Sequence, residues 1–462
     1  MKGIQSLITE GVNVNCANKS GTSTPLLQLI QRIGTDKSGL SRKMREEKIN
    51  NFEKVFKQFL LHGVDINYTT PDGRNVLLTL TGYYSEGNLI NLIRLLVQHG
   101  VEVNPKYKYG WNALLNVCAY YKRRNLIDVV RILIGHAIDT NYTSKDGQNA
   151  LMVVCSNYQH DNLIDIVRLL IDRKIDVNGK SKQGWNSLLS LCFRYPHGNL
   201  KDIFSLLVDN GIYFNCTNDE GMNAMLFLCA NYVNENLIDI ARLLVERGIF
   251  IKYTNKHGFN ALLSSCRSYP LANLKDLVEY FLDHGIGVNG TASKGGWNAH
   301  QSLCKNYSQE NMCDIAKLLI ERGIDLNAKN ENDSDALLLL CEYYSNYGVI
   351  DVVRLFIDHG TDVNSVDNDG FNALLFLCRN YPHTNLIDLR RLPVAMDAAD
   401  YIYYIIYGSF FSEVLLVRMR IPIAAAEQRS TACFFIPPEN YARFTKERWN
   451  GNAAVATVRR SR

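Results

Sequence analysis

The sequence predicts an all-α solenoid of stacked helix-turn-helix units with extended turn fingers, followed by an unrelated C-terminal tail. The main observation is a segment close to DGxNALLxLCxxYxxxNLIDIVRLLIxxGIDVN, which recurs nine times in the 462 residues. Its turn positions lie 37 residues apart at every step except one of 38. Each segment also carries two short apolar patterns joined by turns. One such unit cannot bury its hydrophobic face alone, so neighbouring units must supply the core.

Residues 146–178 illustrate the elements that each unit is expected to form. Asp146 and Gly147 supply turn chemistry, because glycine tolerates the positive φ that tight turns demand. Asn149 stands directly before an apolar run, where its amide oxygen can accept from the first free N–H groups. We therefore expect Asn149 to cap a first helix that ends near Tyr158.

A second helix is expected to open at Asn162, with Asp165 as a capping-box-like partner three residues later. Apolar residues then recur with a period near 3.6, which predicts that this helix packs inward. We expect Leu169 to be buried on that face. Residues 176–178 return the chain toward the next turn.

Cysteine and tyrosine each occupy a constant position in the repeat. Eight of the twelve cysteines share one register: Cys118, Cys155, Cys192, Cys229, Cys266, Cys304, Cys341 and Cys378. Equivalent positions in stacked helices are roughly 10 Å apart, too far for a disulfide, so we expect small buried residues between helices. No C-x-x-C pair suggests zinc. Free thiols and the absence of a signal-type apolar start favour the cytoplasm and leave the nucleus open.

The tyrosine row is unbroken: Tyr84, Tyr121, Tyr158, Tyr195, Tyr232, Tyr269, Tyr307, Tyr344 and Tyr381. An invariant register indicates packing that every unit needs, whereas recognition needs variation from unit to unit. We interpret these residues as structural, with rings that fill space between the helices and hydroxyls that need a partner or water. Phosphorylation is the functional alternative.

Two antiparallel helices, an extended turn and the GIDVN ending resemble the ankyrin repeat. The matching residues are Asp72-Gly73, Asn112-Ala113-Leu114-Leu115, Ile166-Val167-Arg168-Leu169-Leu170-Ile171 and Gly323-Ile324-Asp325-Leu326-Asn327. The resemblance covers about residues 1–390. Repeats of that family are typically about 33 residues long, whereas four extra residues, including the tyrosine, fall between the helices here. The family's Thr-Pro-Leu-His opening is replaced by Asn-Ala-Leu-Leu.

The repeat pattern also predicts the domain organisation. We expect an array over residues 1–390, with a partial N-terminal unit, an inserted surface loop near residues 34–48 and regular repeats from 72 to 390. Proline in Arg391-Leu392-Pro393 breaks the last second helix, and a tail over residues 391–462 follows. For this tail we consider a capping helix, disorder, a membrane anchor at residues 401–417, and a sequence artefact.

Charge and motifs argue against several function classes. The tail carries ten of the 50 basic and six of the 46 acidic side chains, which leaves 40 of each in residues 1–390. Nucleic acid is an unexpected partner for such a balanced array, because a binder needs a basic stripe. No nucleophile motif or phosphate-cradling loop is found, so we expect no catalysis, no small-molecule substrate and no cofactor or metal.

Candidate binding residues follow the turn position, where five units carry an aromatic residue. The resemblance implies that this row lies near the turn tips, beside a concave surface that binds partners. A variable position of the first helix is expected to face the same side, where two units carry phenylalanine. The candidates are Trp111, Trp185, Phe227, Phe259, Trp297, Phe371 and Phe376. Packing of each ring on the neighbouring unit is the alternative.

The sequence therefore favours a non-catalytic scaffold that binds a protein partner of unknown identity along the concave face and the turn tips. A membrane-associated adaptor anchored by residues 401–417 is one alternative. A binding arm of a larger multidomain protein is another.

Overall fold

The computed structural model describes residues 2–380, apart from 36–40, 87, 106 and 344–348. These described residues form helices and turns, with a single isolated β-bridge between Val366 and Asn372. The predicted all-α repeat solenoid is confirmed. The tail expected at residues 391–462 and the tyrosines Tyr344 and Tyr381 lie outside the described residues.

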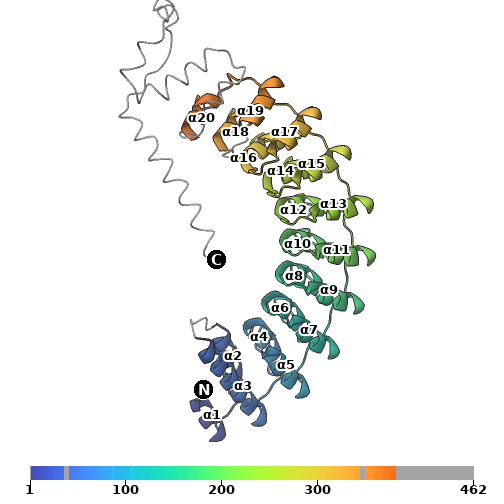
Figure 1. Ribbon diagram of the computed structural model, residues 1–462. Helices are drawn as coiled ribbons and strands as arrows, with labels where there is room; N and C mark the ends of the chain where they lie inside the picture. Colours follow the sequence, from blue (N-terminus) through green and yellow to red (C-terminus); the bar gives the residue numbers. More distant parts are fainter. Residues whose placement is uncertain (1, 36–40, 87, 106, 344–348, 381–462) are drawn as a thin grey trace, which may run out of the picture. The chain divides into compact units, whose positions relative to one another are not determined.

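The helices form two parallel rows within the array (Figure 1). The inner row consists of α2 (Pro25–Thr35), α4 (Val76–Tyr83), α6 (Ala113–Tyr120), α8 (Ala150–Asn157), α10 (Ser187–Arg194), α12 (Ala224–Asn231), α14 (Ala261–Ser268), α16 (Ala299–Asn306), α18 (Ala336–Tyr343) and α20 (Ala373–Asn380). The outer row consists of α1 (Lys2–Thr9), α3 (Arg42–Leu61), α5 (Leu89–Gln98), α7 (Leu126–Gly135), α9 (Leu163–Asp172), α11 (Leu200–Asp209), α13 (Leu237–Glu246), α15 (Leu274–Asp283), α17 (Met312–Glu321) and α19 (Val349–Asp358). Each inner helix packs against the next inner helix, most outer helices contact the next outer helix, and the inner row lies on the concave side.

The described residues of the expected surface loop at 34–48 are helical apart from Ser41, and the first two of them end α2. Residues 42–48 form the first two turns of α3, which runs over 20 residues from Arg42 to Leu61. Ser41 begins this helix, because its hydroxyl accepts from the N–H of Met44 at 3.4 Å. The insertion therefore lengthens an outer helix.

Inner helices begin at the predicted caps. The amide oxygen of Asn149 accepts from the N–H of Met152 at 3.0 Å, and its amide nitrogen donates to the carbonyl of Asp176 at 2.7 Å. One side chain thus satisfies a free helical donor and holds the return segment of its own unit. Gly147 precedes it with φ of 79°, and a Cβ there would lie 2.8 Å from the Lys180 carbonyl in the next turn. Glycine is needed at this turn for both reasons.

The predicted capping role of Asn162 is wrong. Asn162 makes no side-chain bond to the first turn of α9. Its amide oxygen accepts instead from the Tyr158 hydroxyl at 2.9 Å, and its amide nitrogen donates to the carbonyl of Arg124 at 2.9 Å in the preceding unit. The side chain therefore connects two units, and this connection takes the place of the cap.

Tyrosines of this row are buried and hydrogen-bonded between units, as the packing interpretation requires. The Tyr195 hydroxyl lies 2.8 Å from the amide oxygen of Asn199 and 3.1 Å from the carbonyl of His160, so it can donate to either. Asn199 also donates to the carbonyl of Asp161 at 2.7 Å. Five consecutive units repeat the tyrosine contact with the preceding loop, from Tyr158 to Tyr307. We call this the tyrosine-asparagine ladder.

A second ladder joins the return segments. Asn178 accepts from the N–H of Tyr213 at 2.7 Å and donates to the carbonyl of Gly211 at 2.9 Å. Equivalent pairs recur at Asn67, Asn104, Asn141, Asn215, Asn289 and Asn327. Adjacent units are therefore held in one register at two levels, beside the apolar packing of their helices.

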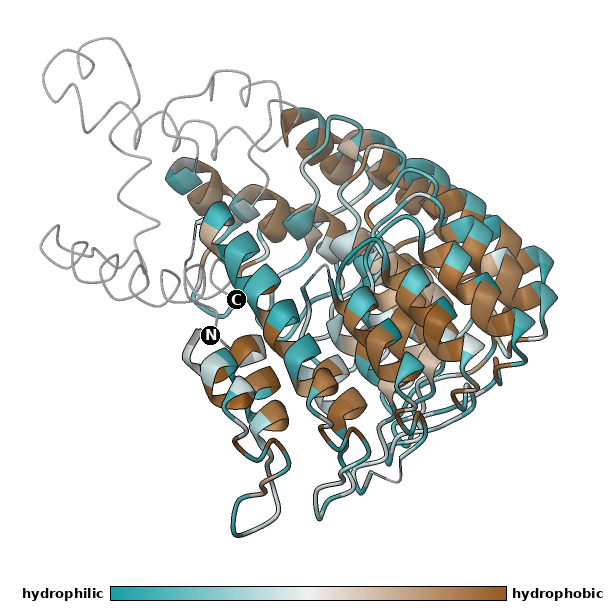
Figure 2. Ribbon diagram, turned by 90° about the horizontal axis from the view of Figure 1, so that it is seen from below, coloured by the Kyte–Doolittle hydropathy of each residue, from teal (hydrophilic) through white to brown (hydrophobic). Residues whose placement is uncertain are grey.

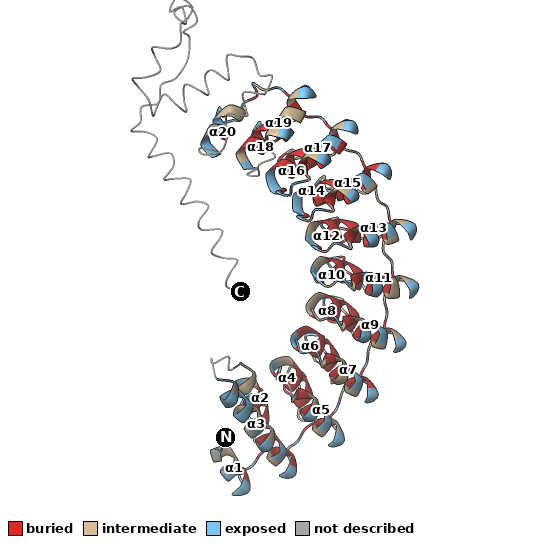
Figure 3. Ribbon diagram, viewed as in Figure 1, coloured by how far each residue is buried: buried red, intermediate tan, exposed pale blue. Residues whose placement is uncertain are grey.

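The apolar core is continuous from unit to unit (Figure 3). The outer helices have an apolar side and a polar side, whereas the inner helices are buried over most of their length. Figure 2 shows apolar residues in brown and polar residues in teal. On α9, Leu170 is fully buried, whereas Leu169 is only half-buried, so the expectation for Leu169 is wrong. Periodicity located the apolar face of α9 but did not locate its centre.

Cysteines of the constant register are buried and free at Cys118, Cys155, Cys192, Cys229, Cys266, Cys304 and Cys341. Burial raises the pKa of the Cys118, Cys229 and Cys266 thiols to about 12. Such thiols stay protonated at neutral pH and pack as small apolar groups. The side chain of Cys378 lies outside the described set.

Burial on α9 yields a first prediction. Replacing Leu170 by Ala should lower the free energy of unfolding by about 2–5 kcal/mol, because it leaves a cavity in a fully buried site. Replacing Leu169 by Ala should cost clearly less, since that side chain is already partly in water. Urea unfolding followed by circular dichroism measures both. A cost for Leu169 equal to or above that for Leu170 would contradict this orientation of α9.

The tyrosine-asparagine ladder yields a second prediction. Replacing Tyr195 by Phe removes the hydroxyl that joins two units and should lower the free energy of unfolding by about 0.5–1.5 kcal/mol. Tyr213 provides the matched control, because its ring is 73% exposed. Replacing Tyr213 by Phe should leave thermal unfolding unchanged. If the two replacements change the free energy of unfolding equally, the tyrosine hydroxyls of the row do not stabilise the stack.

Candidate functional site

Residues that follow the turns reach the exposed last turn of the inner helix in their own unit. The rings of Trp111 and Tyr120 are nearly parallel, with centroids 6.1 Å apart and an interplanar angle of 25°. The Lys305 ammonium lies 4.8 Å from the ring centroid of Trp297. The residue that follows the turn and the last turn of the inner helix thus form one surface on the inner row. This concave surface consists of Trp111, Tyr120, Trp185, Phe193, Arg194, Phe259, Arg267, Trp297, Lys305, Tyr343, Phe371 and Arg379.

The structure places five of the seven predicted residues at this surface. Trp111, Trp185, Phe259, Trp297 and Phe371 are all half-buried. Each of these rings therefore has one part in contact with the array and another part accessible to solvent. Such rigid, partly exposed rings can contribute contact area to an interface at a small cost in side-chain entropy.

The expectation that Phe227 and Phe376 face the concave side is wrong. Their side chains are only 4% and 3% exposed. Both occupy the middle of an eight-residue inner helix, at a position where the side chain is buried in the array. Phe227 lies beneath Trp185, with centroids 5.0 Å apart, and Phe376 lies beneath Phe371 at 5.2 Å. Phe227 and Phe376 therefore pack against the inner side of two rings of the concave surface.

Trp185 also shows the alternative role, because its ring packs on the neighbouring unit. Its ring contacts Phe193 of α10 at 5.4 Å and Phe227 of α12 at 5.0 Å. Phe193 and Phe227 are themselves 5.3 Å apart. This three-ring cluster joins two units, so replacing Trp185 affects packing as well as exposed area.

Four cations complete the concave surface, and sequence reasoning did not find them. Arg194, Arg267, Lys305 and Arg379 stand in the last turns of α10, α14, α16 and α20. Three of them lie over the ring that follows the turn of the same unit, at Phe259, Trp297 and Phe371. The signal was present in the sequence as a cation eight residues after an aromatic residue. To interpret this spacing, one must know that the residue after the turn contacts the last turn of the inner helix in the same unit.

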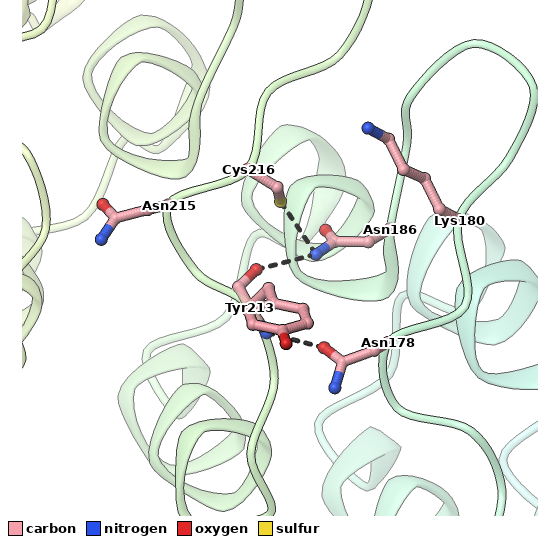
Figure 4. A pocket seen from close by; sticks show the side chains of 6 residues that line it. All are labelled: Asn178, Lys180, Asn186, Tyr213, Asn215 and Cys216. Atoms are coloured by element: carbon pink, nitrogen blue, oxygen red, sulfur yellow. Dashed lines mark hydrogen bonds between the residues drawn. The ribbon is translucent and has the colours of Figure 1, made fainter.

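A cavity of about 300 Å³ lies between the return segments of two central units (Figure 4). Its asparagine side chains Asn178, Asn186 and Asn215 already form hydrogen bonds within the fold. Asn186 donates to the Tyr213 carbonyl at 3.1 Å and to the Cys216 sulfur at 3.0 Å, and it also accepts from the N–H of Leu189. We therefore place the candidate site on the concave surface and not in this cavity.

The described residues also contain a buried histidine. His300 is fully buried in α16, at a position that is leucine in most units, and its ring meets the edge of Phe356 at 4.5 Å. Burial lowers the pKa of His300 to about 3, so the ring is neutral at pH 7 and belongs to the core. Within residues 2–380 as described, no group of three His, Cys, Asp or Glu side chains could hold a metal ion. No helix in that part of the chain is long and apolar enough to span a membrane.

Comparison with known proteins agrees with this architecture. A family model described as ankyrin repeats (three copies) matches residues 47–144, 115–218, 189–292 and 303–389. A search of curated proteins found no match to the chain. Ankyrin repeats are generally protein-protein interaction modules, and proteins that contain them are typically non-catalytic. The repeated helix pairs and the matched residues, which cover most of the sequence, show that this chain belongs to the ankyrin-repeat family.

Proposed function

We propose that the array is a non-catalytic scaffold that binds a protein partner along its concave face and its turn tips. The observation that carries this proposal is the contrast between constant and variable rows. Tyrosines, capping asparagines and cysteines repeat with little change because every unit needs them for packing. The concave surface keeps its positions but changes its side chains from unit to unit, which recognition of a specific partner requires.

Turn tips offer further contact residues. Tyr109 lies at the tip of one turn and is 51% exposed. Its ring meets Tyr107 edge-on at 5.3 Å, and the ammonium groups of Lys108 and Lys145 lie 4.8 and 6.0 Å from its centroid. An exposed ring that neighbouring side chains hold in place is typical of residues that anchor protein interfaces.

We also propose a cytoplasmic location. The ten cysteines whose side chains are described are free. Unpaired cysteines in this number fit a reducing compartment better than an oxidising one. Fractionation of cells that express the chain tests this location directly.

The binding proposal is tested by removing two rings whose described ring contacts lie within their own units. A full-length chain with Trp111 and Trp297 both replaced by Ala should lose partners that the parent chain captures from cell lysate. We expect each ring to contribute about 2 kcal/mol or more to binding. Circular dichroism confirms that the variant is folded.

The matched control replaces Tyr213 and Phe250 by Ala. These rings are 73% and 67% exposed on the return segments, away from the concave surface. The control should retain all partners. Identical partner lists for parent, variant and control would place recognition outside the concave rings.

A further inference from the structure

The cations on the concave surface are exposed, and none of them pairs with an acidic side chain of the described residues. The side chains of Arg194, Arg267, Lys305 and Arg379 are all exposed. None of them forms an ion pair or a hydrogen bond with another described residue. Their contacts are with aromatic rings, at distances of 4.8–5.9 Å from cation to centroid. Ring contacts hold the cations in place and leave their donors available.

The inner row is also nearly free of carboxylates. From α4 to α20, the inner helices contain one acidic residue, Glu342. The outer helices, in contrast, carry an acidic residue in the first turn at Asp128, Asp165, Asp202, Asp239, Asp276, Asp314 and Asp351. The array is balanced in total charge, but its charges are sorted, and the inner helices from α10 to α20 carry four cations against one carboxylate, Glu342.

Lys122 extends the basic region toward α8. Its ammonium donates to the carbonyl of Asn157 at 2.6 Å, at the end of that helix. The pKa of Lys122 is lowered to about 8, mainly by burial and in smaller part by the positive charge of Arg194. The two cations thus repel each other, and a bound anion would relieve this repulsion.

Helix stability does not account for the cations. A cation in the last turn complements the partial negative charge at a helix C-terminus. Five of the nine inner helices from α4 to α20 nevertheless end without one, at α4, α6, α8, α12 and α18. The cations are therefore not a requirement of the repeat.

We propose that the basic part of the concave surface binds an acidic, extended segment of the protein partner, whose Asp or Glu side chains pair with Arg194, Arg267, Lys305 and Arg379. This inference rests on the proposed function and specifies the chemistry of the partner. The binding segment lies across the inner helices, with its carboxylates at the cations and its apolar groups on the rings between them. Arginine suits this role, because its planar group can hold a carboxylate through two parallel hydrogen bonds.

Repeat geometry also constrains the spacing of acidic residues in the segment. Packed helices are roughly 8–10 Å apart, and a polyproline II chain advances roughly 9 Å for each turn of three residues. One turn of such a chain therefore matches one step of the array. The cations stand on α10, α14, α16 and α20, which are two, one and two steps apart. Acidic residues spaced by about six, three and six positions would meet them in turn.

Other occupants fit the surface less well. Single-stranded nucleic acid needs free ring faces for base stacking, whereas cations lie over Phe259, Trp297 and Phe371. The tail of the chain itself, residues 391–462, carries ten basic and six acidic side chains and has the wrong net charge. An acidic protein segment combines the required charge with side chains that can contact the rings.

The test measures binding of fluorescein-labelled synthetic peptides to the full-length chain by fluorescence anisotropy. One peptide carries Glu at the matching spacing, a second has the same composition with the Glu positions shuffled, and a third has Gln in place of Glu. The matching peptide should bind most tightly and the Gln peptide least. Binding should weaken as salt is raised, because exposed ion pairs are screened. In a variant with R194Q, R267Q, K305Q and R379Q, affinity should fall about tenfold or more.

The matched control removes the same number and kind of charges from the outer row, as R94Q, R168Q, R242Q and K317Q. Those four residues are exposed on α5, α9, α13 and α17. This control should keep the parent affinity. Equal losses in both variants, or equal binding of the Glu and Gln peptides, would overturn the inference. Tighter binding of a single-stranded RNA of equal charge, lost in the inner-row variant only, would replace the protein segment with nucleic acid.

These outcomes are separate from those that bear on the proposed function. If the acidic peptides fail while the Trp111 and Trp297 variant still loses its lysate partners, the scaffold function stands and recognition is apolar. If the lysate partners are unaffected by both the ring variant and the inner-row charge variant, the concave surface itself is the wrong location.

Discussion

Every feature of this chain depends on the inability of one unit to bury its own apolar face. A pair of helices of eight and ten residues exposes too much apolar surface to be stable alone, so the fold exists only as a stack. The polar contacts also depend on neighbouring units. Tyr195 and Asn199 bond to the preceding unit, and Asn178 bonds to the following one. Interfaces between units therefore stabilise the fold and also fix the spacing of whatever lies on its surface.

This fixed spacing connects the fold to the function that we propose. The buried rows use the same side chains in nearly every unit, and they hold the inner helices in a regular series. The final residue of those helices is exposed in most units, so its side chain can vary with little change in the core. Rings and cations at these positions thus form a surface in which the fold sets the spacing and the individual side chains set the chemistry.

Local signals in the sequence were predictive, whereas contacts between units were not. Asn149 was recognisable as a cap, because the capping residue and the helix that it caps are adjacent in the sequence. Asn162 was misinterpreted, since its partners are a tyrosine hydroxyl and a carbonyl of the preceding unit. Phe227 was placed on the wrong side because position within a short helix decides burial. The cations were missed because a turn residue contacts the helix eight residues later, which periodicity alone does not reveal.

The central claim is that partners contact the concave side of the stack, and site-specific photo-cross-linking tests it most directly. A cross-linking amino acid at position 231 stands at the exposed end of inner helix α12, and one at position 246 stands at the exposed end of outer helix α13 in the same unit. The account predicts adducts with a partner protein from position 231 and none from position 246. Adducts from position 246 alone would show that the outer row is the binding face.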